Sequence, residues 1–572
     1  MAAVPPSRTP EQPLAAVSSD GTLPTGNPAS RGRRGLIAVA VVLAVVLLFL
    51  AYLQVSRTYP ENSDESNDLL MGWDILHGNL LLHGWYLSDV SFITTELPQY
   101  ALLVGLLGLH TATAHVAAAM TYTLVVIFAV LLARGSAAEV PREQAWPRML
   151  LTAGLLFAPQ LGVAVFVVLL SLGHSGTAVP LLLIWLVIDR AARFRSRWIP
   201  VAVAVLMTWA LVADPLVLVV GVVPLMAVCA FRVARELVLA RRRDGGEAGW
   251  AAACLRAQWY ELALAVAAIV AEGLASVVNR LVSARGGFIL HPVPYQLAPV
   301  RTWPKHAYVT VKGLLALFGA KPEGPPVALV FALLHLIGVA LVIWAAWRVV
   351  RHFATWPDLI SQVLLVAMVV NVVLYVPSTL ADATDLNARE FAVVLPFGAV
   401  LAGRTLGASL LARPAPDRTH PTGSRMGWRR WTAVAVAACY AAGLGWAAAT
   451  PARPAMNTQL ARFLASHHLT SGIGGYWLSS VVTVGSDGAV TVRAVTPGNL
   501  SPDLWEAKKS WYDPASHTAT FLVTDSASGF FNHWQPKASA LAKLGPPART
   551  YHVGTYTVYV WDKNLLSEIP RG

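Results

Sequence analysis

The stretch from Tyr59 to Asn79, YPENSDESNDLLMGWDILHGN, follows directly after the first long apolar run of the chain. Its first half is crowded with acidic side chains, among them the pair Asp64-Glu65. Its second half has apolar residues at helical spacing, which predicts one helix face made of Leu69, Trp73, Leu76 and Leu80. Such a helix can lie along a membrane surface. Carboxylates and a surface helix therefore meet at a water interface, which suits chemistry on a lipid-borne substrate better than membrane anchoring.

Composition places the stretch in a multi-pass membrane protein. The chain has 572 residues, of which 56% are hydrophobic and only 13% are charged. Many apolar runs are long enough to cross a hydrocarbon core about 30 Å thick. We predict eleven spans, near residues 36–55, 112–133, 148–168, 176–189, 198–212, 216–231, 259–281, 326–347, 359–377, 391–411 and 431–449.

The distribution of Lys and Arg predicts the orientation. These residues gather in alternate loops, as expected of cytoplasmic loops near span ends, so we expect a cytoplasmic N-terminus and an extracytoplasmic C-terminus. Residues 1–34 are rich in Pro, Ser, Ala and Thr, which predicts a disordered cytoplasmic tail. The net charge of +12 follows from the cytoplasmic arginines and needs no nucleic-acid partner. Abundant Ala, Val and Arg with few Lys are typical of high-GC bacteria such as actinobacteria.

Three outer segments remain: residues 56–111, residues 282–325 and a tail of residues 450–572. The tail is long enough to fold as a domain. Helical spacing near Leu460 and four strand-like runs predict a small extracytoplasmic α/β domain, with strands at 481–484, 489–495, 519–524 and 556–561. Its tryptophans either bind an acceptor or form the domain's core: Trp477, Trp505, Trp511 and Trp534.

The order of these features resembles the membrane-embedded glycosyltransferases of the GT-C fold, which include protein O-mannosyltransferases and the lipid A aminoarabinose transferase. By motif and order the resemblance covers roughly residues 36–240. Asp64-Glu65 stands at the family's Asp-Glu position after the first span. Glu96-Leu97-Pro98 stands where the aminoarabinose-type enzymes carry Lys-Pro-Pro, so a basic residue is missing there. The resemblance implies a GT-C-like membrane domain over residues 35–449, with the site in outer loop 56–111.

The resemblance also implies a reaction: transfer of a sugar from a polyprenyl-phosphate donor to an envelope polysaccharide, glycolipid or protein outside the cytoplasmic membrane. An attacking acceptor hydroxyl must lose a proton, and Asp64 is the candidate base, with Glu65 beside it. Asp89, Glu96 and His174 are candidate substrate-binding residues. The departing phosphate calls for cations, and the candidates are Arg285, Arg301, Lys305, Lys312 and Arg389.

Each assignment has a structural alternative. Asp64 is also a suitable helix cap, and Asp68 and Asp74 suit the solvated face of the same helix. Asp89, Glu96 and His174 are common in turns and first helical turns. The basic residues at 301–312 suit anionic headgroups, and Arg389 suits a local pair with Glu390.

Other classes of function lack sequence support. No Gly-x-Gly-x-x-Gly follows a strand, and neither a Walker-type Gly-Lys-Ser/Thr nor a His-Glu-x-x-His is present. We assign no metal ligands and leave a divalent metal ion open as a cofactor. The remaining alternative is a non-catalytic scaffold or transporter with an envelope-binding external domain. The two hypotheses differ in whether Asp64, Glu96 and the basic outer residues converge on one cavity.

Overall fold

A computed structural model describes residues 28–570, except for gaps at 137–139, 171–173, 192–193, 244–248, 292, 294, 324–325, 382–383, 412–424 and 530. The chain divides into two units, Met1–Leu48 and Phe49–Gly572, and every contact discussed below lies within the second. Of the predicted N-terminal tail, residues 1–27 lie outside the described part. Residues 28–34 belong to helix α1, which therefore begins within the segment predicted to be disordered.

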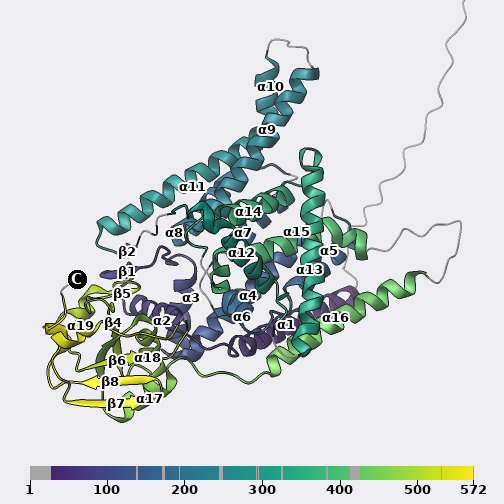
Figure 1. Cartoon of the computed structure of the whole chain (residues 1–572). Helices are drawn as coiled ribbons and strands as arrows, with labels where there is room; N and C mark the ends of the chain where they lie inside the picture. Colours follow the sequence, from purple (N-terminus) through teal and green to yellow (C-terminus); the bar gives the residue numbers. More distant parts are fainter. Residues whose placement is uncertain are drawn as a thin grey trace, which may run out of the picture. The chain divides into compact units, whose positions relative to one another are not determined.

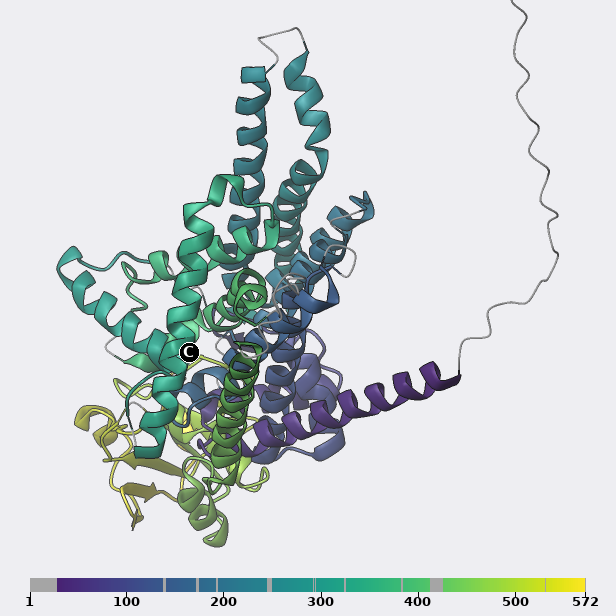
Figure 2. The same ribbon diagram turned by 90° about the vertical axis from the view of Figure 1, so that its right-hand side faces the viewer.

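A helix occupies each of the eleven predicted runs: α1 Pro28–Ser56, α4 Thr111–Arg134, α5 Arg142–Leu156, α7 Ala178–Ala191, α8 Trp198–Ala213, α9 Val223–Arg243, α11 Trp259–Ala284, α13 Pro326–Arg351, α14 Leu359–Tyr375, α15 Val394–Leu411 and α16 Arg425–Ala449. Among the described residues, five helices are long and apolar enough to cross a membrane, so this is a multi-pass membrane protein. The total of eleven spans stays a prediction, because several of the other helices are shorter. Figures 1 and 2 show α9 and α11 side by side, joined through α10 Trp250–Ala257.

The predicted span at 148–168 is divided. α5 ends at Leu156, and the chain resumes as α6 Val163–Val165 and the π-helix η1 Phe166–Leu170. Pro159 between them lacks a backbone donor, and Gly162 adopts a φ of +92°, which a continuous helix does not allow. Apolar composition predicted one continuous helix here, because composition alone does not reveal a local break of this kind.

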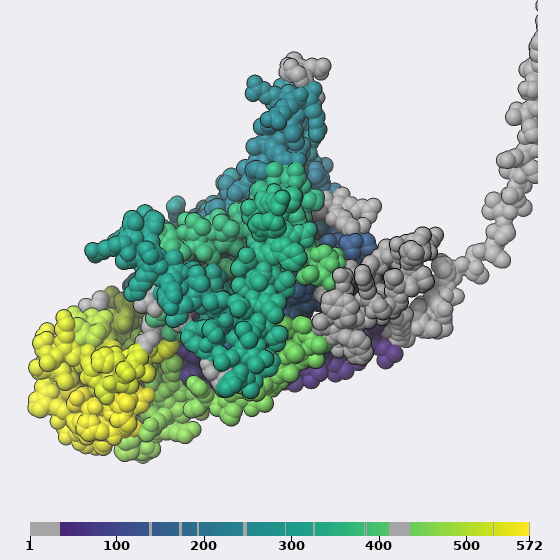
Figure 3. Space-filling view, turned by 45° about the vertical axis from the view of Figure 1, so that its right-hand side comes forward, coloured from purple at the N-terminus to yellow at the C-terminus, as the bar shows by residue number. Residues whose placement is uncertain are grey.

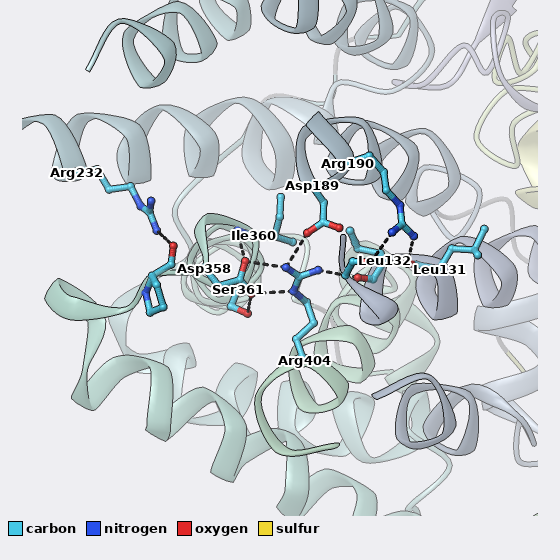
Figure 4. Close-up of polar contacts among 11 residues, drawn as sticks. Leu131, Leu132, Asp189, Arg190, Arg232, Asp358, Ile360, Ser361 and Arg404 are labelled. Atoms are coloured by element: carbon cyan, nitrogen blue, oxygen red, sulfur yellow. Dashed lines mark hydrogen bonds and ion pairs between the residues drawn. The ribbon is translucent and has the colours of Figure 1, made fainter. Parts of the chain in front are cut away.

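One buried arginine connects four helices of the bundle (Figure 4). Arg404 of α15 donates to Asp358, the N-cap of α14, and to Asp189 of α7, each at 2.8 Å. A third bond reaches the carbonyl of Leu132 in α4 at 2.7 Å. An unpaired charge at this depth is costly, so Arg404 and its two carboxylates stabilise the bundle only as a group.

The first outer segment forms two short helices that cross closely. α2 covers Ser63–Leu76 and α3 covers Glu96–Leu107. A Cβ on Gly72 would lie 2.9 Å from the backbone nitrogen of Ala101, so only glycine permits this approach. The predicted surface face is wrong in part, because Leu69 is fully buried and α2 ends before Leu80.

The C-terminal residues build a mixed five-stranded sheet of order β4-β3-β6-β8-β7. β3 is parallel to β4 and β6, whereas β8 is antiparallel to β6 and β7. Alternation along β6 sends Phe521 and Val523 into one apolar cluster and Leu522 into a second, on opposite faces. The bounds are α17 Thr458–Ser466, β3 Ser471–Gly474, α18 Ser480–Gly485, β4 Thr491–Ala494, β6 Phe521–Asp525, α19 Ala538–Lys543, β7 Arg549–Val553 and β8 Tyr556–Val560. Figure 3 shows these residues, in light green to yellow, gathered together.

Three of the four predicted strands are confirmed, and the one at 481–484 is wrong. These residues form helix α18, whose side chains are buried between the sheet and α2. Tertiary packing overrides the strand propensity of the β-branched run. β3 and β7 were not predicted from the sequence.

A second small sheet attaches this C-terminal body to the outer segments of the membrane part. β1 Trp85–Leu87 pairs in parallel with β2 Ile289–Leu290 and antiparallel with β5 Ala507–Lys508. Next to it, Lys508 forms an ion pair with Asp74 of α2 at 2.8 Å. The C-terminal residues therefore pack on α2, the helix that carries the candidate base.

Candidate active site

Three parts of the chain enclose a cavity of about 420 Å³. They are the start of α2 with the loop before α3, the segment at His174 with the 3-10 helix η5 Asp385–Phe391, and the C-terminal body. The lining residues are Asp64, Asp68, Ser88, Asp89, Val90, Phe92, His174, Arg389, Glu390, Tyr476, Trp477, Asp503, Trp505 and Glu506. Four of the residues predicted for the site converge here: Asp64, Asp89, His174 and Arg389.

The cap of α2 separates the roles of Asp64 and Glu65. Asn62 is the N-cap, and its side chain accepts a hydrogen bond from the backbone N–H of Asp64 at 2.8 Å. The Glu65 carboxylate accepts the Asn62 N–H at 2.9 Å and completes a capping box. Glu65 is 1% exposed and does not line the cavity, so the structure gives it a capping position in place of the predicted catalytic one. The side chain of Asp64 is not the cap and opens into the cavity.

Asp64 lies between a cation and a hydroxyl. Nη1 of Arg389, from η5, lies 3.4 Å from one Asp64 oxygen. The hydroxyl of Tyr476, in the 3-10 helix η6 Tyr476–Leu478, donates to the other at 2.8 Å. Segments more than 300 residues away in sequence therefore hold this carboxylate.

A second carboxylate from the C-terminal body approaches the same tyrosine. Oε2 of Glu506 lies 2.5 Å from the Tyr476 hydroxyl and 3.1 Å from the amide of Asn67. Burial, with the nearby charge of Asp64, raises the pKa of Glu506 to about 7. Burial, with the charge of Glu506, also raises the pKa of Asp68. The prediction that Asp68 belongs to a solvated face is wrong, because its side chain is 4% exposed.

His174 lines the cavity and lies between two carboxylates. Its Nδ1 lies 2.6 Å from Asp214 and its Nε2 lies 3.3 Å from Glu390. Burial alone would lower the pKa of His174, but the charge of Asp214, with Glu390, outweighs it and raises the pKa well above the usual 6.5. Glu390 also approaches Arg389, at 3.7 Å. Charges of alternating sign thus run from Asp214 through His174, Glu390 and Arg389 to Asp64.

Asp89, in the loop before α3, and Glu96, the first residue of α3, have different positions. Asp89 lines the cavity, and burial raises its pKa. Glu96 is buried beside Gly176, where an added Cβ would lie 1.6 Å from its Oε1, and it does not line the cavity. The close approach requires glycine at 176. Glu96 therefore packs behind His174, outside the cavity.

The cations predicted in residues 282–325 lie elsewhere. Arg285 is the C-cap of α11, and Arg301 is exposed at the start of α12 Trp303–Leu317. Lys305 lines a separate pocket of about 270 Å³ with His306 and Thr379. Their predicted role at the donor phosphate therefore receives no support from the cavity around Asp64.

Some residues that line the cavity were not predicted from the sequence, and the role of others was left open. Trp477 and Trp505 line the cavity as the acceptor-binding alternative requires, whereas Trp511 and Trp534 pack on the apolar clusters. The sequence around Tyr476, Asp503 and Glu506 did not indicate that these residues line the cavity. Among the described residues, no group of three or more His, Cys, Asp and Glu side chains is arranged to hold a metal ion.

Comparison with known proteins identifies the fold. No family model and no curated protein matches the sequence. The structure is similar to ArnT from Cupriavidus metallidurans bound to undecaprenyl phosphate, with a TM-score of 0.50 and 15% identity over 92% of this chain and 98% of ArnT. The chain has the GT-C fold. The apo state of the same ArnT gives a TM-score of 0.49, 15% identity, and coverage of 95% and 100%. The apo oligosaccharyltransferase of Archaeoglobus fulgidus gives 0.42 and 12% identity over 84% and 69%.

Proposed function

We propose that the protein is a glycosyltransferase that moves a sugar from a polyprenyl-phosphate donor to an envelope acceptor outside the cytoplasmic membrane. The position of Asp64 is the observation that carries the proposal. It opens into a cavity between Arg389 and Tyr476 and does not cap its own helix. The GT-C fold supports the class of donor, because ArnT, which shares it, binds undecaprenyl phosphate.

The arrangement suits a displacement at the anomeric carbon. An acceptor hydroxyl that enters the cavity gives its proton to Asp64 as its oxygen bonds to that carbon. The bond from the carbon to the phosphate oxygen breaks, and polyprenyl phosphate leaves. Arg389 can donate to the departing phosphate, since its guanidinium has donors beyond the one directed at Asp64. Attack from the face opposite the phosphate inverts the anomeric configuration.

The cavity also has the chemistry of a sugar site. Trp477 and Trp505 present apolar faces, and ring faces of this kind pack against sugar rings. Asp89 and Asp503 offer acceptors for sugar hydroxyls. The scaffold or transporter alternative gives no reason for a base, a cation and aromatic side chains to converge in one place, and no contact among the described residues favours it.

Sugar transfer in proteoliposomes tests the proposal. The purified protein is supplied with a panel of polyprenyl-phosphate sugars and with envelope extracts, and released polyprenyl phosphate and glycosylated acceptor are quantified. We expect transfer from at least one donor, and a loss of about 10²–10⁴ in rate for Asp64→Asn. Asp562→Asn, at an exposed position of the C-terminal body, is the matched control. Absence of transfer from every donor, or equal transfer by wild type and Asp64→Asn, would overturn the proposal.

A further inference from the structure

The contacts around Tyr476 require more protons than this hydroxyl supplies. Its oxygen lies 2.8 Å from Asp64 and 2.5 Å from Glu506, both hydrogen-bond distances. A phenol has one proton to donate, and two oxygens without a proton between them repel at such separations. One of the two carboxyl groups must therefore carry a proton of its own.

The surroundings decide which carboxyl group holds that proton. Arg389 lies 3.4 Å from Asp64 and places a positive charge beside it. Glu506 is half-buried, and the described groups at its carboxyl oxygens are neutral: the Tyr476 hydroxyl, the Asn67 amide and the Ser88 hydroxyl. The charged groups that face it are Asp64 and Asp68 on α2 and the more distant Arg389 on η5. A proton on Glu506 lets this carboxyl group donate to Tyr476, whose hydroxyl is then free to donate to Asp64.

We propose that Tyr476 and Glu506 are positioning residues of the C-terminal body that share one proton with Asp64 and keep that base oriented. This inference rests on the proposed function and goes beyond it: the C-terminal body completes the catalytic centre in addition to any binding of the acceptor. When Glu506 loses its proton, it competes with Asp64 for the Tyr476 hydroxyl and adds a negative charge beside the base. Transfer therefore falls as the pH rises through about 7.

The pH dependence of transfer tests this unit, with each variant normalised to its own maximum. Glu506→Gln retains a donor toward Tyr476 and cannot ionise, so its alkaline limb near pH 7 disappears. Tyr476→Phe removes the hydroxyl for which Asp64 and Glu506 compete, so its alkaline limb near pH 7 weakens. A structural contact alone would lower the rate without moving either limb.

Matched controls come from the same C-terminal body. Tyr556→Phe removes a hydroxyl that donates to Asn457 at 2.8 Å, and Glu568→Gln removes a carboxylate paired with Lys563 at 3.2 Å. Both controls keep the wild-type limbs. Wild-type limbs in Glu506→Gln and Tyr476→Phe as well would overturn the inference while leaving the proposed glycosyltransferase intact.

A second readout needs no donor or acceptor. Infrared spectroscopy of the full-length protein in vesicles follows the C=O band of protonated carboxyl groups as the pH is raised. The spectrum of wild type minus Glu506→Gln should contain one such band, lost near pH 7. If that difference spectrum has no protonated band below pH 7, the proton does not reside on Glu506 and the inference is wrong, whatever the transfer assay gives.

Discussion

At the scale of single residues, position along α2 decides which of two adjacent carboxyl groups can act. Asp64 and Glu65 look equivalent in sequence, and both are predicted to be catalytic. The Glu65 side chain points back to the N-cap and is buried there. The Asp64 side chain instead lies between Arg389 and Tyr476. Sequence gives the dipeptide but not the direction of each side chain, because the cap residue Asn62 was not identified.

Replacement of Arg389 tests the cation beside the base. Arg389→Gln removes both the charge near Asp64 and the donors proposed for the phosphate, and we expect kcat/KM for the lipid donor to fall by about 10²–10³. Arg389→Lys keeps the charge without the forked donor and recovers part of the loss. Arg301→Gln removes an exposed guanidinium outside the cavity and should have a far smaller effect. Equal losses in Arg389→Gln and Arg301→Gln would argue against this assignment.

The buried histidine gives a prediction about stability and pH. Because the folded-state pKa of His174 is raised, its pairing with Asp214 and Glu390 stabilises the fold fully below about pH 6.5. That stabilisation is lost as the pH rises through the higher folded-state pKa. His174→Gln leaves buried Asp214 without its cation, at a cost of about 3–5 kcal/mol, while Glu390 keeps Arg389 at 3.7 Å. Thermal unfolding in detergent should show a gap between wild type and variant that is widest at mildly acid pH. At lower pH the pairing is lost as Asp214 protonates, whose pKa His174 holds below its usual value despite burial. A constant gap would contradict the pairing.

At the scale of elements, the cap of α2 connects stability to the site. Asn62→Ala removes the side-chain acceptor for the N–H of Asp64 and should lower the free energy of unfolding by about 0.5–2 kcal/mol. Asn62→Asp keeps an acceptor at the N-cap and is the matched control. Thermal unfolding gives the stability, and the transfer rate per folded molecule reports whether Asp64 has shifted. A stability in Asn62→Ala equal to that of Asn62→Asp would show that the cap is not needed.

Elements with a clear apolar period were predictable, and those decided by packing were not. Helices occur at all eleven predicted runs. The run at 481–484 has the composition of a strand, yet it is helical because α2 and the sheet bury it. β3, with two glycines in four residues, lacks any strand signal, although parallel pairing with β4 and β6 places it inside the sheet.

At the scale of the whole molecule, the site is assembled from segments that are distant in sequence. Asp64, His174, Arg389 and Glu506 meet in one cavity although they are spread over more than 400 residues. The prediction found the members from the first outer loop, where order along the chain is informative. It placed the phosphate-binding cations mainly in residues 282–325, because charge and side of the membrane do not reveal which loop reaches the cavity.

The Arg404 cluster tests the bundle on which that assembly depends. Arg404→Leu leaves Asp189 and Asp358 buried without their shared cation, and we expect a loss of about 3–5 kcal/mol in stability. Arg351→Leu, at the exposed end of α13, removes only a contact over Trp347 and should cost no more than about 1 kcal/mol. Thermal unfolding in detergent compares the two variants. Equal melting temperatures for Arg404→Leu and wild type would mean that the cluster does not support the bundle.

The central claim is that Asp64, and not its neighbour, is the base of a lipid-dependent sugar transfer. Its most direct test is the single-turnover rate of Asp64→Asn beside Glu65→Gln, each corrected for the folded fraction. Both changes replace a carboxyl group by its amide, and glutamine can retain the capping bond to Asn62. We predict that Asp64→Asn loses about 10²–10⁴ in rate, while Glu65→Gln stays close to wild type. Equal losses in both variants, or a loss in Glu65→Gln alone, would contradict the account.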